Sequence, residues 1–311
     1  MIRDIAARVS PPHVIVTHLT SMESSPLRSR LLILAAALLF STAGAMFKAA
    51  TLTGWQIASF RSGVAALFLL LALPEARRGW SWRVVPVAAA YAATLISFAL
   101  SNRLTTAADA IFLQSSAPLY VLLLGPWLLH EAIRRADIVY MLAVGAGMSV
   151  FFLGTESGVA TAPNPTLGNV LAAFSGLAYA SMLTGLRWLA RRHETNPGIA
   201  TVALGNVLAC LAALPMALPV SAPGIVNLSL VLYLGVAQIG LAYICLTRGI
   251  RHIPAFEATT LLLLEPAMSP LWTWLVHDEK PGRWSLAGGA VILIATLAHT
   301  WRKSRLENQP A

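Results

Sequence analysis

The chain has 311 residues, of which 57% are hydrophobic and only 11% are charged, and its formal net charge is +9. An ordinary soluble domain carries roughly 25% charged residues, so this composition excludes a soluble fold and predicts an integral membrane protein. The two cysteines, Cys210 and Cys245, lie in apolar runs. Their spacing fits neither a disulfide framework nor a metal site, which indicates two small buried hydrophobic side chains.

Residues 1–28 are polar and contain prolines, and we expect them to form a disordered cytoplasmic tail. Met22 stands ahead of the run RSRLLILAAALLF and is a second candidate for the start of the chain. With Arg28 and Arg30 before its apolar part and small residues after it, this run also imitates a signal peptide. Because many apolar runs follow, we interpret it as an uncleaved first membrane span.

Ten apolar runs follow one another along the chain, and a helix needs about 20 such residues to cross a bilayer. The connections between them are short, so no separate soluble domain fits between the runs. The sequence therefore predicts an all-α integral membrane protein with ten transmembrane helices. The runs are approximately 30–50, 54–74, 83–101, 105–128, 136–154, 166–190, 199–219, 227–247, 255–276 and 284–301.

The positions of Lys and Arg indicate the orientation, because cytoplasmic loops of membrane proteins are enriched in these residues. If the N-terminus is cytoplasmic, 17 of the 22 Lys and Arg residues fall on that side of the membrane. Lys48, Arg103, Lys280 and Arg283 fall on the other side, and Arg61 lies inside a span. The sequence therefore predicts that both termini are cytoplasmic. The basic charge reflects topology and contact with anionic lipid, so we expect no nucleic-acid partner.

The second half of the chain repeats the pattern of the first, at offsets that change only in the loops. Because five is an odd number of spans, the second unit enters the membrane from the opposite side, as in the inverted repeats of secondary transporters. A duplication retained without transport is the alternative. We predict a first five-helix repeat over 29–154, a periplasmic connecting loop over 155–165, a second, inverted repeat over 166–301 and a cytoplasmic tail over 302–311. The aligned pairs are Arg103 with Arg251, Asp109 with Glu257, Pro118 with Pro266 and Glu131 with Glu279 at an offset of 148, Arg61 with Asn206 and Pro74 with Pro219 at 145, and Lys48 with Arg187 at 139.

Each half has a proline midway through its fourth helix and a glutamate at the end of that helix. The residues that carry this pattern are Pro118 with Glu131, Glu265-Pro266 with Glu279, and Arg61 in the second span. Over about residues 30–301 the chain resembles the drug/metabolite transporter superfamily of the EamA type. The resemblance implies a bacterial inner-membrane exporter of small metabolites, often amino acids, and the aromatic amino-acid exporter branch is one candidate. It also implies that helices 3, 4, 8 and 9 line a central cavity and that helices 5 and 10 are peripheral.

The run LLLLEPAMSPLW, residues 261–272, places Glu265 in the middle of an apolar segment. A charge near the bilayer centre costs about 2.5–3.5 kcal/mol on insertion scales, so this acid must be neutral, paired or exposed to a water-filled cavity. We predict that it contacts substrate, and Glu265 is the candidate proton-coupling residue. The alternative is a buried acid that only hydrogen-bonds a neighbouring helix.

Pro118, Pro266 and Pro270 lie inside apolar runs and are the predicted gating or kink positions. Proline lacks an amide hydrogen and clashes with the turn before it, so each one frees a backbone carbonyl four residues earlier. Such carbonyls can bind a cation or an amino group, or let the helix bend. Kinks without a role in transport are the alternative.

Arg61 is the other charge inside a span. A structural ion pair, or snorkelling of the long side chain to the interface, is the leading interpretation, and contact with a substrate carboxylate is the alternative. Glu131 and Glu279 end matching spans and are predicted to have a structural role, by capping or by pairing with nearby arginines.

Polar and aromatic side chains at mid-depth are candidates for the wall of a substrate cavity. Tyr91, Thr94 and Phe98 are spaced by three and four residues, which places them on one helical face. Helix packing through hydroxyl groups explains the same spacing, and Trp272 also fits the aromatic belt of a membrane interface. The predicted substrate-binding residues are Tyr91, Thr94, Phe98, Gln114, Ser115, Tyr179, Met182, Gln238, Tyr243, Glu265 and Trp272.

Motifs for enzymatic chemistry are absent from the sequence. HEAIRR, residues 130–135, lacks the second histidine of a HExxH zinc motif, and no P-loop occurs. We therefore expect no enzyme activity, no metal and no cofactor. The predicted function is a secondary transporter that exports small metabolites, foremost neutral or aromatic amino acids, by alternating access, as a monomer in the lipid bilayer. A multidrug or cationic-compound exporter is the alternative, and an intramembrane lipid-acting enzyme or a channel is more remote.

Overall fold

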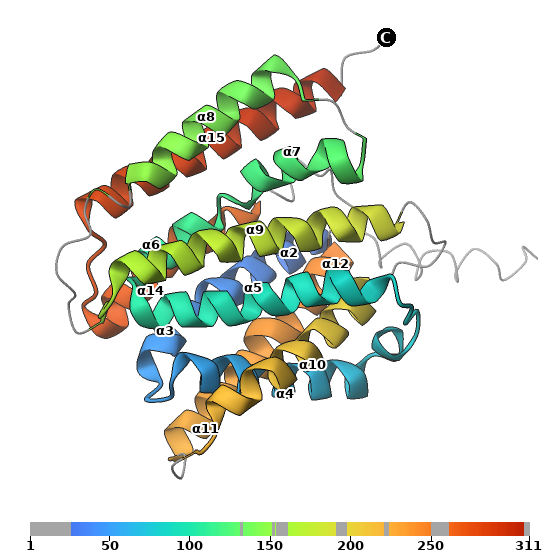
Figure 1. Ribbon diagram of the computed structural model, residues 1–311, viewed down its shortest axis with the longest axis vertical. Coiled ribbons are helices and arrows are strands. Elements are labelled where there is room, and N and C mark those ends of the chain that lie inside the picture. Colours follow the sequence, from blue (N-terminus) through green and yellow to red (C-terminus); the bar gives the residue numbers. More distant parts are fainter. Residues whose placement is uncertain are drawn as a thin grey trace, which may run out of the picture.

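The computed structural model describes residues 26–130, 133–150, 153, 161–190, 198–220, 224–249 and 261–307. The elements in these ranges are helices, and they form an elongated bundle (Figure 1). In chain order they are α2 (Pro26–Ser41), α3 (Ala43–Ala49), α4 (Gly54–Ala72), the short 3-10 helix η2 (Pro74–Arg77), α5 (Val84–Leu104), α6 (Ala107–Gln114), α7 (Ala117–Leu128), α8 (Arg135–Val150), α9 (Pro165–Ala190), α10 (Gly198–Ala217), α11 (Ile225–Leu232), the π-helix η3 (Tyr233–Leu241), α12 (Ala242–Gly249), α14 (Leu264–His277) and α15 (Arg283–Glu307). Most of the predicted tail over 1–28 lies outside the described residues, as does most of the predicted loop over 155–165.

These elements make the ten predicted spans, because three of the spans are assembled from shorter helices. The first span is α2 followed by α3, the fourth is α6 followed by α7, and the eighth is α11, η3 and α12 in succession. The other seven spans are the single helices α4, α5, α8, α9, α10, α14 and α15. The predicted all-α membrane fold with two five-helix repeats is therefore confirmed.

Within the described ranges, seven stretches are long and apolar enough to cross a membrane: Leu27–Ala49, Gly54–Ala72, Val84–Leu104, Ala107–Leu128, Pro165–Leu189, Gly198–Ala217 and Ile225–Gly249. Helices α8 and α14 are shorter in the described part of the chain, with 16 and 14 residues. The apolar part of α15 is Arg283–His299. The chain is thus a multi-pass membrane protein. The beginning of the predicted ninth span, before residue 261, lies outside the described ranges.

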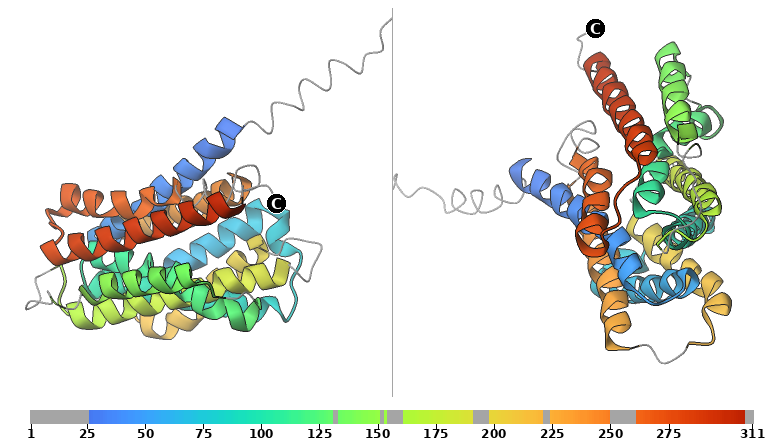
Figure 2. Two further views of the ribbon diagram at one scale, coloured as in Figure 1. Left: turned by 90° about the horizontal axis from the view of Figure 1, so that it is seen from above. Right: turned by 90° about the vertical axis from the view of Figure 1, so that its left-hand side faces the viewer.

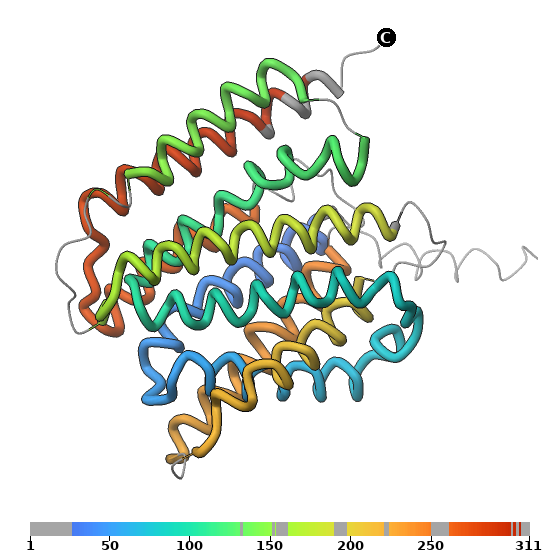
Figure 3. Tube along the Cα trace, viewed as in Figure 1, coloured from blue at the N-terminus to red at the C-terminus, as the bar shows by residue number. Residues whose placement is uncertain are grey.

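Helices α8 and α15, which are the fifth and tenth spans, lie side by side at one edge of the bundle (Figures 1 and 3). Tyr140 of α8 stacks on His299 of α15 with a centroid distance of 4.4 Å, and its hydroxyl lies 3.2 Å from the hydroxyl of Thr296. The peripheral position that the family resemblance implied for these two helices is confirmed. Helix α2 begins and α15 ends toward the same end of the bundle, as an even number of spans requires (Figure 2).

Helix α5 lies in the middle of the bundle, with α9 on one side and α4 and α10 on another. Glycines permit these close contacts, as is usual between membrane helices. A Cβ atom on Gly205 of α10 would lie 2.6 Å from the Tyr91 ring, and one on Gly168 of α9 would lie 2.6 Å from the backbone nitrogen of Thr105. The core of the molecule therefore depends on small residues that bring backbones together.

The aligned prolines Pro118 and Pro266 mark helix starts, whereas a kink within a continuous helix was expected. Helix α6 ends at Gln114, and Pro118 is the second residue of α7, where a missing amide hydrogen leaves no hydrogen bond unmade. Pro266 lies in the first turn of α14, after a short turn in the chain. Pro270 is inside α14. The fourth span of each repeat is thus interrupted at the matching proline.

We predict that Gly168→Ala destabilises the bundle, because the added methyl group would meet the fixed backbone at the junction of α5 and α6. Overpacking of this kind costs about 1–3 kcal/mol. The measurement is the apparent melting temperature of the purified protein in detergent, followed by size-exclusion chromatography. Gly145→Ala in α8 is the matched control, because nothing lies within 4 Å of its added Cβ. Equal melting temperatures for the two variants would contradict the packing described for α9.

Candidate functional site

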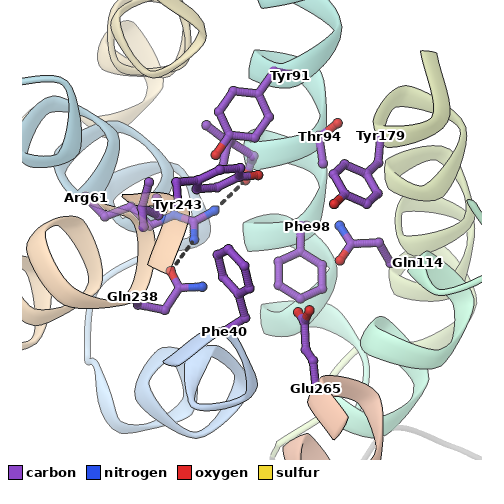
Figure 4. A pocket seen from close by; sticks show the side chains of 12 residues that line it. Phe40, Arg61, Tyr91, Thr94, Phe98, Gln114, Tyr179, Gln238, Tyr243 and Glu265 are labelled. Atoms are coloured by element: carbon purple, nitrogen blue, oxygen red, sulfur yellow. Dashed lines mark hydrogen bonds between the residues drawn. The ribbon is translucent and has the colours of Figure 1, made fainter. Parts of the chain in front are cut away.

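A cavity of about 80 Å³ lies between the two repeats, near the middle of α5. Its wall takes side chains from the first, second, third and fourth spans and from the sixth, eighth and ninth (Figure 4). The lining residues are Phe40, Arg61, Tyr91, Thr94, Leu95, Phe98, Gln114, Tyr179, Gln238, Ile239, Tyr243 and Glu265. Both repeats therefore contribute to one site, as an alternating-access carrier requires.

Eight of the eleven predicted substrate-binding side chains meet in this cavity. They are Tyr91, Thr94, Phe98, Gln114, Tyr179, Gln238, Tyr243 and Glu265. The 3.6-residue period of α5 explains why Tyr91, Thr94 and Phe98 share a face, as predicted.

The structure places the other three predicted residues outside the cavity lining. The Ser115 hydroxyl donates to the carbonyl of Ile111 at 2.7 Å, within the end of its own helix. Met182 is buried in the hydrophobic core. The indole of Trp272 donates to the Ser41 hydroxyl at 2.9 Å and so joins α14 to α2.

Phe40, Leu95, Ile239 and Arg61 line the cavity but were not among the predicted substrate-binding residues. The first three are apolar residues in apolar helices, so no sequence signal separates them from core or lipid-facing positions. Arg61 could have been identified from the sequence, because an ionisable residue inside a membrane span is a candidate functional residue by default.

Helix interruptions surround the cavity. Phe40 is next to the end of α2, Gln114 is the last residue of α6, Gln238 lies in the π-helix η3, and Glu265 is the second residue of α14. Membrane proteins tolerate such irregular backbone where it is buried in protein or lines a cavity. The broken helices thus contribute Gln114, Gln238 and Glu265 to the cavity, and the unbroken helices α4 and α5 contribute Arg61, Tyr91 and Thr94.

Aromatic rings from several helices make up much of the cavity wall. Tyr243 makes edge-to-face contacts with Tyr91 and with Phe40, at centroid distances of 5.6 and 5.2 Å. Tyr179 and Phe98 face the same space from α9 and α5 (Figure 4). This wall suits an apolar or aromatic ligand surface.

Arg61 is almost fully buried, with 1% of its surface exposed. Its Nη2 donates to the carbonyl of Leu95 at 3.0 Å, and its Nη1 donates to the side-chain oxygen of Gln238 at 3.4 Å. Its Cζ lies 4.7 Å from the ring centroid of Phe47. The Nε atom has no hydrogen-bond partner. Among the described residues, no carboxylate pairs with this guanidinium.

Glu265 enters the cavity from the first turn of α14 (Figure 4). It makes no hydrogen bond and no ion pair with any residue in the described ranges. The amino end of a helix carries a partial positive charge that favours a carboxylate. Its place in the helix therefore lowers the free-energy cost of this acid while leaving its oxygens free for a ligand.

A second set of buried polar side chains lies where α3, α6 and the start of α15 approach one another. We call it the end cluster, and its members are Lys48, Thr105, Asp109, Asn169, Glu279 and Ser285. Lys48 pairs with Glu279 at 3.3 Å, and each side chain is only 4% exposed. Lys48 also donates to the carbonyls of Thr105, at 2.8 Å, and Thr161, while Glu279 accepts from the amide of Ala107 at 2.8 Å. Glu279 was predicted to cap a helix or to pair with a nearby arginine. It accepts from the first amide of α6, and its ion-pair partner is Lys48 of the other repeat in place of an arginine. The matching Glu131 lies outside the described residues.

Asp109 extends the end cluster. Its carboxylate accepts from the Ser285 hydroxyl. The Thr105 hydroxyl lies 3.3 Å from the same carboxylate and 2.7 Å from the side-chain oxygen of Asn169, and its single hydrogen is donated to one of them at a time. The end cluster therefore joins the two repeats, and none of its residues lines the cavity. Within the described residues, no group of three or more His, Cys, Asp or Glu side chains is arranged to hold a metal ion.

The sequence matches the EamA-like transporter family twice, over residues 27–153 and 166–301. Among curated proteins, it is similar to the pseudopaline exporter CntI of two strains of Pseudomonas aeruginosa. The chain is 28% identical to the protein of strain UCBPP-PA14 over 278 residues, which cover 86% of this chain and 94% of the relative. The match to the protein of strain PAO1 is 28% over 281 residues, with the same coverage.

Among solved structures, one titled only as the crystal structure of a protein shares this fold. The two structures superpose with a TM-score of 0.60 over 90% of this chain and 99% of the other chain. The two sequences are 21% identical, so this likeness concerns the fold alone.

We predict that breaking the Lys48–Glu279 pair strongly destabilises the protein. Removal of one partner of a buried ion pair leaves an uncompensated charge and costs about 3–5 kcal/mol. Lys48→Met and Glu279→Gln should each lower the free energy of unfolding by about this amount, and the double variant should lose less than their sum. The measurement is unfolding by denaturing detergent in bicelles. Lys280→Met is the matched control, because Lys280 is exposed beside Glu279. Additive losses, or an equal loss in the control, would contradict the pairing.

Proposed function

Since the chain belongs to the EamA-like transporter family and is a secondary transporter, we propose that it exports small metabolites of the amino-acid class, with neutral or aromatic side chains, by alternating access. The observation that carries this proposal is the chemistry of the cavity. It combines aromatic rings from both repeats with one cation, Arg61, and one acid, Glu265. A zwitterion with an apolar side chain complements all three features.

The helix interruptions around the cavity support alternating access. The interruptions of the first, fourth and eighth spans and the turn before α14 are the places where these spans can bend. Pro118, Pro266 and Pro270 lie at or near such places, which supports their proposed role in gating.

The similarity to the pseudopaline exporters supports export as the direction of transport. At 28% identity we infer the substrate class from the cavity of this chain and not from the substrate of those relatives. A cationic-compound exporter is the second candidate. Glu265 favours it, because its carboxylate would hold a cation against the aromatic rings of the cavity.

We further propose a bacterial inner-membrane location with both termini in the cytoplasm and action as a monomer. The excess of Lys and Arg on one side of the predicted spans supports this orientation. The proposed repeats are 29–154 and 166–301, with the periplasmic loop 155–165 between them.

We predict counterflow of amino acids by the purified protein in proteoliposomes. Vesicles are loaded with unlabelled amino acids, and the entry of labelled tryptophan, phenylalanine, threonine and methionine is followed with and without a pH gradient. We expect labelled aromatic amino acids to accumulate transiently, because a carrier exchanges substrate across the membrane. Protein-free vesicles are the control. No counterflow of any of the four by folded protein would refute the amino-acid proposal and favour the cationic-compound exporter.

We predict that Glu265→Gln abolishes transport driven by a pH gradient and spares exchange. The amide cannot take up or release a proton, but it can still accept a hydrogen bond from a substrate. Accumulation in the variant should therefore fall to the level measured without a gradient. Asp278→Asn is the matched control, because Asp278 is an exposed carboxylate that follows the same helix and asparagine tolerates its left-handed backbone. An unchanged gradient dependence in Glu265→Gln would exclude Glu265 as the proton-coupling residue.

A further inference from the structure

We propose that Arg61 is the carboxylate-binding group of the cavity, so that a transported solute must carry a carboxylate or a similar planar anion beside its apolar part. This inference rests on the proposed function, because it assigns the substrate chemistry of the same cavity. It reverses the preference derived from the sequence, where snorkelling or a structural ion pair was the leading interpretation of Arg61.

The burial of Arg61 argues against snorkelling. Its side chain is 1% exposed, and both of its hydrogen bonds go to groups inside the bundle, on α5 and η3. A snorkelling arginine extends toward the membrane surface, where its charge meets water and lipid headgroups. The guanidinium instead faces the cavity wall beside Tyr243 (Figure 4).

The partners of Arg61 leave its charge without compensation. The Leu95 carbonyl, the Gln238 amide oxygen and the Phe47 ring are all neutral. Arginine stays protonated in proteins, and a buried charge needs a counter-charge as well as hydrogen bonds. In the described part of the chain no carboxylate pairs with it, Glu265 of the same cavity included. An anionic ligand would supply the missing charge.

The geometry of the guanidinium suits a carboxylate. Its five N–H groups form a planar fork that can bind both oxygens of a carboxylate at once. The Nε atom is buried and has no partner, and the bond to Gln238 is long at 3.4 Å. A ligand carboxylate can therefore bind at Nε, or displace the weak bond from Nη1 to Gln238, while the 3.0 Å bond from Nη2 to Leu95 still holds the group in place.

The backbone around Arg61 holds the group in position. Gln238 lies in the π-helix η3. Such helices are rare in proteins overall, and those that occur are often found at functional sites. A Cβ atom on Gly235 of η3 would lie 2.8 Å from the carbonyl oxygen of Arg61, so the two backbones are in close contact there. This close approach brings η3, which carries Gln238, next to the backbone of Arg61.

Glu265 completes the assignment. It enters from α14, and it has no ion-pair partner among the described residues. A zwitterion can place its carboxylate on Arg61 and its ammonium group toward Glu265. A cation without a carboxylate gains from Glu265 but is repelled by Arg61, so the proposal separates amino acids from lipophilic amines.

The test uses three probes with the same phenyl group: L-phenylalanine, 3-phenylpropionate, which lacks the amine, and 2-phenylethylamine, which lacks the carboxylate. Their apparent affinities are measured by thermal stabilisation of the purified full-length protein. We expect the wild-type protein to bind both carboxylates more tightly than 2-phenylethylamine. Arg61→Lys keeps the buried charge and loses the fork, so it should weaken the two carboxylates about ten- to a hundredfold and leave the amine unchanged.

A second variant avoids the removal of a buried group. Gln238→Glu is nearly isosteric and places a carboxylate of the protein on Arg61, at the position of the 3.4 Å contact. It should exclude the two carboxylate probes and spare 2-phenylethylamine. Gln114→Glu is the matched control, because it adds the same charge to the same cavity at a residue that bonds Ser175 and not Arg61. It should weaken the carboxylates less than Gln238→Glu does.

The outcomes separate this proposal from the proposed function. Equal effects of the two glutamate variants, equal losses for all three probes, or a wild-type protein that binds neither carboxylate would overturn the role of Arg61. Preference of the wild type for 2-phenylethylamine would also overturn it and would favour the cationic-compound exporter. Carboxylate binding that depends on Arg61, together with no amino-acid counterflow, would support the role of Arg61 and refute the amino-acid export.

Discussion

The structure depends on one constraint: inside a bilayer, a charged or polar group must be satisfied by the protein itself or by a cavity. The chain carries few charged residues in or next to its spans, and these residues are found in two kinds of surroundings. Lys48 and Glu279 are paired across the repeats and surrounded by backbone hydrogen-bond partners. Arg61 and Glu265 face a common cavity without a charged partner in the described ranges. The first pair holds the bundle together, and the second pair is available for a ligand.

The helix interruptions follow from the same constraint. A continuous helix satisfies the hydrogen bonds of its own backbone, whereas an interruption leaves backbone groups that need other partners. The ends of α2 and α6, the π-helix η3 and the start of α14 break this pattern around the cavity and bring Gln114, Gln238 and Glu265 to mid-depth. The matching prolines Pro118 and Pro266 each lie at such a break, so the fourth span of each repeat is interrupted at the same aligned position.

The end cluster and the cavity differ in how their buried polar atoms are satisfied. The end cluster joins α3 and α6 of the first repeat to Glu279 of the second, and its atoms are buried and mutually bonded. The cavity lies between the same repeats but has polar atoms without partners, such as Nε of Arg61. A carrier needs both, because the repeats must stay associated while they move around a site that is empty in part of each cycle.

The sequence by itself determined the membrane fold, because ten apolar runs of sufficient length and a repeat offset are local and periodic signals. It also identified Glu265 and the face of Tyr91, Thr94 and Phe98, because a charge in an apolar run and a spacing of three and four residues are visible along a single helix. Only the tertiary structure decided which spans meet. It joined Arg61 to Gln238 and Leu95, gave Glu279 the partner Lys48, and placed Ser115, Met182 and Trp272 away from the cavity. These outcomes depend on contacts between helices far apart in the chain, and periodicity within one helix carries no information about the neighbour that it faces.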